Sequence, residues 1–280
     1  MKVKLVADSS ANLQEFIGAD YTSVPLKIVA GDKEYVDDAS LDALNMMKEM
    51  KEYKGKSGTA CPGVGEWMEA FDNADEVYGV AITSQLSGCY NASQVATEHY
   101  LDENPNAKVF ILDSLSTGPE MHLILEKYKE LLEAGKNFEE ICEEIKEYHK
   151  HTNLMFSLES LNNLARNGRV STVVAAAVGM LGIRIVGRAE NGQLEPMHKC
   201  RGEKKALQQI FKSMKELGYN GGKVRISHSY NENAANKLAE MIRESYPGCD
   251  ISIGLNGGLC CFYAEEGGVL VGFESDKANK

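Results

Sequence analysis

The chain has 280 residues, of which 43% are hydrophobic and 25% are charged, and its formal net charge is −11. This composition is typical of a globular protein with enough core for one large domain or two ordinary ones. The negative charge argues against nucleic-acid binding, because phosphate recognition needs a concentrated basic surface and no basic run is denser than Arg201–Lys205. It does not exclude an anionic ligand in a local pocket.

The seven cysteines are an odd number and include no Cys-x-x-Cys pair. We expect reduced thiols in a cytoplasmic protein without membrane insertion, since no apolar run is long and unbroken enough for a signal peptide or a membrane span. Cys142, His149 and His151 could be drawn as a zinc site, but their spacing matches no common structural-zinc pattern. We therefore predict neither a metal nor a cofactor.

The first half of the chain alternates between predicted strands and helices. Short apolar runs predict strands at Val3–Ala7, Val24–Val29, Lys33–Val36, Val77–Ile82 and Val109–Leu112. Helical spacing predicts helices at Leu41–Tyr53, Glu66–Asn73, Glu120–Ala134 and Phe138–His151, with a glycine-bracketed loop at Lys56–Gly63. This alternation predicts an α/β fold whose parallel sheet is connected by crossover helices.

The segment Glu76–Ala92 combines a buried strand, a hydroxyl-rich turn at Thr83–Gly88 and the start of a helix. If Ser87 caps that helix, its hydroxyl lies beside unpaired N–H groups at the positive end of the helix dipole. The turn would also lie at the carboxyl end of a strand, where ligands bind in open α/β sheets. Ser84 and Ser87 therefore either contact an anion or only close a turn and cap a helix.

The character of the chain changes after the helix Phe138–His151, and we place a domain boundary near Asn153. Residues 1–153 would form an N-terminal α/β domain and residues 154–280 a second α/β domain. The predicted strands of the second domain are Leu154–Leu158, Ile183–Arg188, Leu194–Lys199, Lys223–His228, Cys249–Ile253 and Val269–Phe273. Its predicted helices are Leu161–Arg166, the small-residue helix Thr172–Leu181, Gly202–Leu217 and Asn231–Tyr246, and Gly254–Gly258 is a predicted turn.

Hydroxyl groups at the ends of strands are the main candidate ligand groups: Ser9, Thr59, Ser84, Ser87 and Ser114. With arginines from the second half, they could satisfy a buried carboxylate, which permits a small-acid or lipid carrier. The chain has no Gly-x-Ser-x-Gly elbow, although a serine-dependent acyl hydrolase stays open as an alternative. Asp8-Ser9-Ser10 stands where a dinucleotide site would need Gly-x-Gly-x-x-Gly.

Seven short motifs in chain order resemble those of the DegV family, which are bacterial fatty-acid-binding proteins that present an acyl chain to a fatty acid kinase. These motifs are Asp8-Ser9-Ser10, Val24-Pro25-Leu26, Thr59 with Pro62, Ile82–Gly88, Asp113-Ser114, Asn167–Ser171, and Arg201 with Lys204-Lys205-Ala206. The resemblance implies two α/β domains with one long-chain fatty acid buried between them, and no catalytic residues.

The resemblance also implies the site residues. Thr59 and Ser87 would hold the carboxylate, Arg169 would lie by the head group, and the helix Thr172–Leu181 would form an apolar wall beside the acyl tail. We assign the ligand site to Thr59, Ser84, Ser87, Gly88, Ser114, Arg169, Arg201 and Tyr263. The expected partners are a long-chain fatty acid and a fatty acid kinase.

The chain departs from the family pattern at Tyr263–Gly267, where the family usually carries His-Thr-Gly-Pro-Gly. The family histidine lies at the head-group site, and Tyr263 takes its place here. Glu265 and Glu266 would repel an acyl phosphate unless they point to solvent. These carboxylates keep a binder of another small organic anion as a third alternative, and fatty-acid binding is better supported than phosphotransfer.

Overall fold

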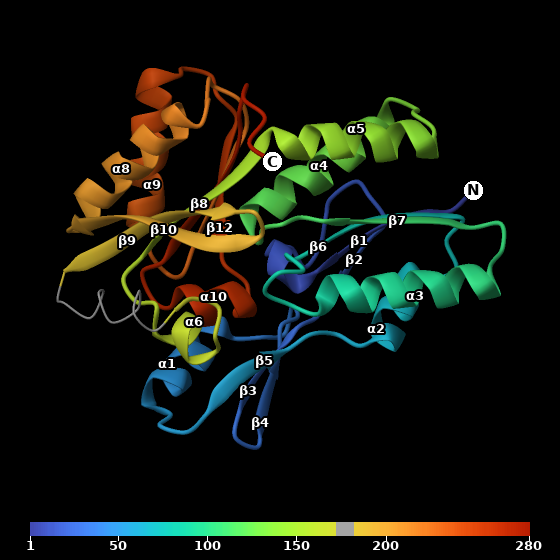
Figure 1. Cartoon of the computed structure of the whole chain (residues 1–280), viewed down its shortest axis with the longest axis horizontal. Coiled ribbons are helices and arrows are strands. Elements are labelled where there is room, and N and C mark those ends of the chain that lie inside the picture. Colours follow the sequence, from blue (N-terminus) through green and yellow to red (C-terminus); the bar gives the residue numbers. More distant parts are fainter. Residues whose placement is uncertain (172–181) are drawn as a thin grey trace.

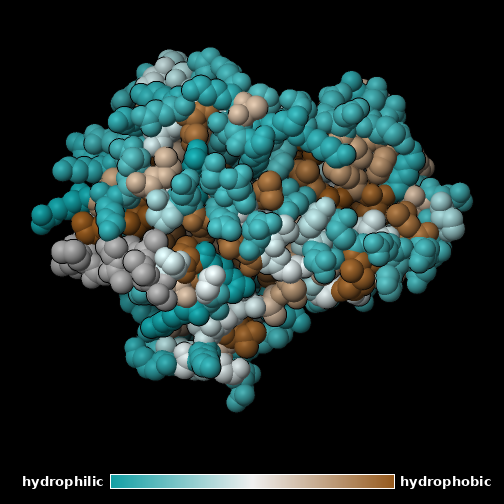
Figure 2. Space-filling view, viewed as in Figure 1, coloured by the Kyte–Doolittle hydropathy of each residue, from teal (hydrophilic) through white to brown (hydrophobic). Residues whose placement is uncertain are grey.

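The computed structural model describes residues 1–171 and 182–280. Three sheets lie among helices in this part of the chain (Figure 1). The helix expected at Thr172–Leu181 lies outside the described residues. Figure 2 shows hydrophilic residues over most of the outline of one face and hydrophobic residues gathered toward its middle.

The first sheet has four parallel strands in the order β2-β1-β6-β7, which confirms the predicted parallel sheet. Alternate residues face opposite sides: Val6 and Val77 pack toward α2 and α3, whereas Leu5 and Tyr78 pack toward α4 and α5. Figure 1 shows the two helix pairs on opposite faces of this sheet. The strands are β1 (Val3–Asp8), β2 (Tyr21–Val24), β6 (Glu76–Ala81) and β7 (Lys108–Asp113), and the short helix η1 (Ser9–Ala11) follows β1.

The helices of the first half agree closely with the sequence analysis. They are α1 (Ala43–Glu52), α2 (Val64–Phe71), α3 (Cys89–Glu103), α4 (Pro119–Glu133) and α5 (Phe138–Lys150). Pro119 occupies the first turn of α4, where its missing N–H costs nothing, and an Asn137–Glu140 capping box begins α5. These local signals explain why the helix boundaries could be read from the sequence.

A small antiparallel sheet, β4-β3-β5, extends from the first half (Figure 1). Its strands are β3 (Lys27–Ala30), β4 (Lys33–Val36) and β5 (Ser57–Ala60). The expected strand Val24–Val29 is instead divided between β2 and β3, because Pro25 has no N–H to donate to a ladder. The prediction of a loop at Lys56–Gly63 is wrong for β5, which pairs Thr59 with Ile28 of β3. Its small polar residues give no strand signal of their own.

The second sheet has six strands in the order β10-β9-β8-β13-β11-β12, and among these pairs only β11 and β12 are parallel. The strands are β8 (Thr152–Leu158), β9 (Ile183–Glu190), β10 (Gln193–Arg201), β11 (Val224–His228), β12 (Ile251–Leu255) and β13 (Val269–Glu274). The helices are α6 (Asn162–Arg166), α8 (Glu203–Glu216), α9 (Glu232–Ser245) and α10 (Gly258–Ala264). Asn191 and Gly192, both with positive φ, form the predicted hairpin turn between β9 and β10.

Helix α4 connects the first half of the chain to the second sheet through the buried Glu120 and the partly buried Glu126. Glu120 accepts a hydrogen bond from the Thr152 hydroxyl at 2.7 Å and pairs with Lys280. Glu126 accepts two hydrogen bonds from the Arg225 guanidinium, both at 2.8 Å. A buried carboxylate is costly unless it is paired, so these contacts hold α4 against β8 and β11.

The predicted boundary near Asn153 falls at the start of β8, the first strand of the second sheet in chain order. The division into residues 1–153 and 154–280 stays a prediction. Within the ranges 1–171 and 182–280, no helix is both long enough and apolar enough to cross a membrane.

The sequence predicts a turn at Gly254–Gly258 and no helix after it, whereas the structure has helix α10 at Gly258–Ala264. Its first N–H groups are held by Asp37, a buried carboxylate from the first half of the chain with 1% exposure. Asp37 accepts hydrogen bonds from the N–H groups of Gly258 at 2.6 Å and Leu259 at 3.0 Å, and from the Ser9 hydroxyl at 2.8 Å. Asn12 accepts from the Gly257 N–H at 2.8 Å. The start of α10 is thus bound to two segments of the first half.

Replacing Asp37 with alanine should destabilise the protein by roughly 2–4 kcal/mol, because two helix N–H groups and the Ser9 hydroxyl would lose their buried acceptor. Urea unfolding followed by circular dichroism measures this change. Asp38→Ala is the matched control, since the Asp38 side chain accepts hydrogen bonds from the N–H and hydroxyl of Ser40 in an exposed turn. Equal midpoints for Asp37→Ala and the parent would show that the carboxylate is not needed to anchor α10.

Candidate functional site

A cavity with an empty volume of about 800 Å³, including the space at its mouth, lies between the two halves of the chain. Its walls are mainly aliphatic. The apolar lining includes Leu86, Leu115, Leu154, Phe156, Leu158 and Leu194. A concave, mainly apolar lining with a few polar groups is typical of a small-molecule site.

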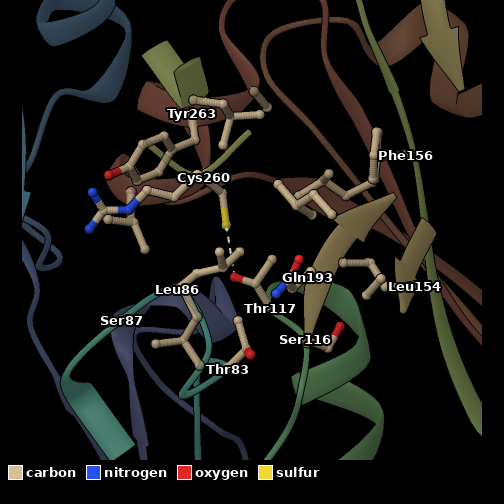
Figure 3. Close-up of a pocket in the computed structure, with 18 of the residues that line it drawn as sticks. Thr83, Leu86, Ser87, Ser116, Thr117, Leu154, Phe156, Gln193, Cys260 and Tyr263 are labelled. Atoms are coloured by element: carbon tan, nitrogen blue, oxygen red, sulfur yellow. Dashed lines mark hydrogen bonds between the residues drawn. The ribbon is translucent and has the colours of Figure 1, made fainter. Parts of the chain in front are cut away.

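Regular secondary structure positions this lining. Leu154, Phe156 and Leu158 are alternate residues of β8, so their side chains share one face of the second sheet. Cys260 and Tyr263 of α10 are three residues apart and therefore lie on one side of that helix. Figure 3 shows Tyr263 on one side of the cavity, Leu154 and Phe156 on the other, and Cys260 and Thr117 between them.

Polar groups gather where β5 meets α10. The Thr59 hydroxyl of β5 and the Tyr263 hydroxyl of α10 are 2.8 Å apart and hydrogen-bonded to each other. Arg169 lines the same cavity and is the only charged residue among its described lining residues. Its guanidinium donates a hydrogen bond to the Asn167 carbonyl. The cavity therefore combines a long apolar wall with one cation and several hydroxyl groups.

Ser87 lies at the start of α3 and lines the cavity, as the sequence analysis proposed for an anion site. The helix begins slightly later than expected: Gly88 is its N-cap residue, and the Ser87 hydroxyl accepts the N–H of Cys89 at 3.3 Å. Ser87 thus satisfies one of the first N–H groups of α3 while its side chain faces the cavity wall.

The remaining predicted ligand residues do not appear among the described cavity residues. The Ser84 N–H donates to Asp113 at 3.1 Å, and the buried Ser114 hydroxyl donates to the Ser116 carbonyl at 3.0 Å. Arg201 is exposed at the end of β10, and Gly88 lies at the N-terminus of α3. Thr59, Ser87, Arg169 and Tyr263 are therefore the predicted residues that the fold brings to one cavity.

The Asp8-Ser9-Ser10 segment, a candidate from the sequence, has a supporting position behind the cavity. Ser9 accepts the Leu26 N–H at 3.0 Å while it donates to Asp37. Asp8 accepts the N–H of Ile82 at 2.6 Å and the N–H of Ser10 at 3.1 Å. Burial raises the pKa of Asp8 to about 6, although these hydrogen bonds oppose the rise. Asp8 thereby connects the end of β1 to the turn that carries Ser87.

Several cavity residues were missed by the sequence analysis because they come from distant parts of the chain. The Thr83 hydroxyl donates a hydrogen bond to the Gly192 carbonyl at 2.8 Å. This contact holds the β9–β10 hairpin against the turn that follows β6. The Cys260 sulfur and the Thr117 hydroxyl oxygen lie 3.7 Å apart within the cavity wall. The apolar run Leu259–Ala264 was a helix signal, but the glycines before it favoured a turn.

The acidic residues that follow Tyr263 do not line the cavity in the described structure. Glu265 accepts hydrogen bonds from the Ser160 hydroxyl at 2.7 Å and the Asn163 N–H at 3.2 Å. Glu266 is exposed and lies 3.4 Å from the Lys51 ammonium group. Because both carboxylates are engaged elsewhere, they do not oppose an anion at the polar end of the cavity.

None of the six histidines is found among the described residues that line the cavity. His149, considered for a zinc site, instead contacts the Ser114 carbonyl through Nε2 at 2.6 Å. The described ranges contain no group of three or more His, Cys, Asp or Glu side chains that could hold a metal ion. The described cavity therefore offers Ser87 no imidazole base.

Comparison with known proteins agrees with the fold. The sequence model described as "Uncharacterised protein, DegV family" matches residues 2–276. A DegV domain-containing protein of Streptococcus pneumoniae is 41% identical over 281 residues, which cover 99% of this chain and 100% of that protein.

Two solved structures are similar over nearly the whole chain. A DegV family protein from Eubacterium eligens, loaded with heptadecanoic acid, is 45% identical with a TM-score of 0.96 over 98% of this chain and 100% of its own. The fatty acid kinase B3 protein of Streptococcus pneumoniae, loaded with linoleic acid, is 41% identical with a TM-score of 0.96 over 99% of this chain and 100% of its own. This chain belongs to the DegV family.

Proposed function

We propose that this protein binds one long-chain fatty acid in the cavity between its two halves. The observation that carries the proposal is the charge pattern of the described lining: aliphatic residues form most of the wall, and Arg169 is its one charged side chain. A ligand that matches this pattern has a long apolar part and one anionic group. The similar proteins loaded with heptadecanoic acid and linoleic acid support the same ligand class.

The apolar wall accounts for affinity for the acyl tail. Each methylene that leaves water for an apolar site contributes about 0.8 kcal/mol, so the tail would supply most of the binding free energy. The residues Leu154, Phe156 and Leu158 on one face of β8 provide a continuous apolar surface for it. A short acid would lose this contribution and bind weakly.

The polar end accounts for the orientation of the ligand. A carboxylate is costly to bury unless hydrogen bonds replace its lost water. Thr59 and Tyr263 each carry a hydroxyl that could turn from its partner to donate to a carboxylate, and Ser87 lies in the same lining. Arg169 adds a charge-assisted contact, which is stronger than a hydrogen bond between neutral groups. In this proposal the head group lies at these residues and the tail extends toward β8.

We propose further that the protein acts as a carrier and presents the acyl carboxylate to a fatty acid kinase, without a catalytic step of its own. The similar Streptococcus pneumoniae protein is named as part of a fatty acid kinase, which supports such a partner. The positions of Glu265 and Glu266 away from the cavity lining remove one electrostatic obstacle to this role. Seven free thiols support a cytoplasmic location.

Organic extraction of the purified protein followed by mass spectrometry tests the ligand class directly. We expect one long-chain fatty acid per chain, because the apolar wall and single cation fit one amphipathic anion. Native mass spectrometry of the intact protein gives the stoichiometry. A protein that is empty and takes up no added fatty acid would refute the carrier proposal and favour another small organic anion.

Replacing Arg169 with glutamine should weaken fatty-acid binding roughly 10- to 100-fold, because a hydrogen bond to a charged group contributes about 1.5–3 kcal/mol. Displacement of a fluorescent fatty acid measures the change in Kd. The matched control is Arg166→Gln, since Arg166 is exposed on α6 and does not line the described cavity. If both variants bind as tightly as the parent, Arg169 does not contact the head group.

Replacing Thr59 and Ser87 together with alanine should weaken binding by a few kcal/mol, on the order of two charge-assisted hydrogen bonds. The same displacement assay applies, with Ser84→Ala as a control from the same turn that lies outside the described lining. Full affinity in the double variant would rule out both hydroxyls as carboxylate ligands. Hydrolysis of chromogenic acyl esters that is lost in Ser87→Ala would instead support a hydrolase.

A further inference from the structure

Two cysteines lie beside the polar end of the cavity. Cys61 directly follows β5 and is exposed, whereas Cys89 is the first residue of α3 and has 0% exposure. The Cys61 sulfur lies 3.3 Å from the position that a Cβ atom would take on Gly88, the neighbour of Cys89. Each thiol is also the largest single influence on the pKa of the other. The end of β5 therefore places Cys61 beside the start of α3, where Cys89 lies.

The two thiols differ in chemical character. The neighbouring Cys89 thiol lowers the pKa of Cys61 to about 6, and this effect outweighs burial and the nearby Glu66, which act in the opposite direction. The Cys61 thiol and burial raise the pKa of Cys89. Cys61, which is exposed, is therefore the more readily deprotonated of the two thiols. An accessible thiolate with a second thiol in contact is the arrangement found in redox-sensing cysteine pairs.

The pair is directly connected to residues of the proposed head-group site. Thr59 precedes Cys61 by two residues on the same strand end, and Ser87 precedes Cys89 by two residues. The Cys89 N–H also donates to the Ser87 hydroxyl at 3.3 Å. A disulfide would shorten the sulfur–sulfur separation to about 2.05 Å, so one or both segments must shift to form it. That shift would move Thr59 and Ser87 relative to each other.

We propose that Cys61 and Cys89 form a reversible disulfide that weakens ligand binding at the adjacent end of the cavity. The effect on the ligand rests on the proposed fatty-acid site, whereas formation of the disulfide does not. The oxidant we consider is hydrogen peroxide. The role fits free thiols in a reducing compartment, where disulfides are transient and report on oxidants.

The reaction balances in two steps. The Cys61 thiolate attacks one peroxide oxygen, the O–O bond breaks, and hydroxide leaves and takes up a proton, so that Cys61 becomes a sulfenic acid. The Cys89 sulfur then attacks the Cys61 sulfur, the S–O bond breaks, and the leaving oxygen and the Cys89 proton depart as water. Two thiols lose two electrons in total and one peroxide is reduced to two waters. A dithiol reductant reverses the change by thiol–disulfide exchange.

Peptide mapping of the full chain tests the disulfide. The protein is treated with hydrogen peroxide, its remaining thiols are blocked with N-ethylmaleimide, and its peptides are analysed without reduction. We expect a cross-linked species that contains the Cys61 and Cys89 peptides and is lighter than their summed masses by two hydrogen atoms. It should disappear after treatment with dithiothreitol. Cys142, whose pKa is raised to about 11 by burial, is an internal control that should react more slowly. Oxidation of Cys61 to a sulfinic acid without a cross-link would overturn the proposal.

Fatty-acid displacement before and after oxidation tests the effect on the ligand. We expect about tenfold weaker binding in the oxidised protein, comparable to the loss of one hydrogen bond at the head group, and recovery after reduction. Cys61→Ser, a change at an exposed position, should bind normally and be insensitive to peroxide. Unchanged affinity in a protein that carries the cross-link would overturn the proposed coupling. If the reduced protein binds no fatty acid, the carrier proposal fails while the mapping still tests the thiol pair.

Discussion

The Asp37 carboxylate is almost completely removed from solvent. It accepts hydrogen bonds from Ser9, Gly258 and Leu259, which are all distant from it in sequence. Burial of an ionised carboxylate is costly, so its position is constrained by the donors that surround it. Those donors include the first N–H groups of α10, the helix that carries Cys260 and Tyr263 into the cavity. The position of Tyr263 at the polar end of the cavity therefore depends on Asp37, which is not among the described lining residues.

The cavity needs both halves of the chain. The first half contributes Thr59 and the turn with Ser87, and the second contributes the apolar face of β8 together with Arg169 and Tyr263. The second half supplies the apolar face and the cation, whereas Thr59 and Ser87 of the first half complete the polar end of the cavity. Contacts that join the halves, such as Glu126 with Arg225, thus also stabilise the site.

The thiol pair adds a chemical property to the same region. Cys61 lies beside the start of α3, where Cys89 is the first residue, because β5 pairs with β3 and α3 begins directly after the Ser87 turn. The hydroxyls and the thiols are consequently carried by the same two short segments. A covalent change at the sulfur atoms would be transmitted to Thr59 and Ser87 over only two residues of backbone.

Local sequence patterns determined the parallel sheet, most helices and the hairpin at Asn191-Gly192, since periodicity, caps and turn residues act over a few residues. Hydroxyls at strand ends also nominated Thr59 and Ser87, and the resemblance to the DegV family assigned these two residues and Arg169 to the head group and added Tyr263. Tertiary structure alone decided that β5 is a strand, since Ser57–Ala60 is held by pairing with β3. It also decided that α10 is a helix, because its first N–H groups need the distant Asp37. Long-range hydrogen bonds leave no local pattern, and for this reason the sequence could nominate the ligand groups but not their assembly.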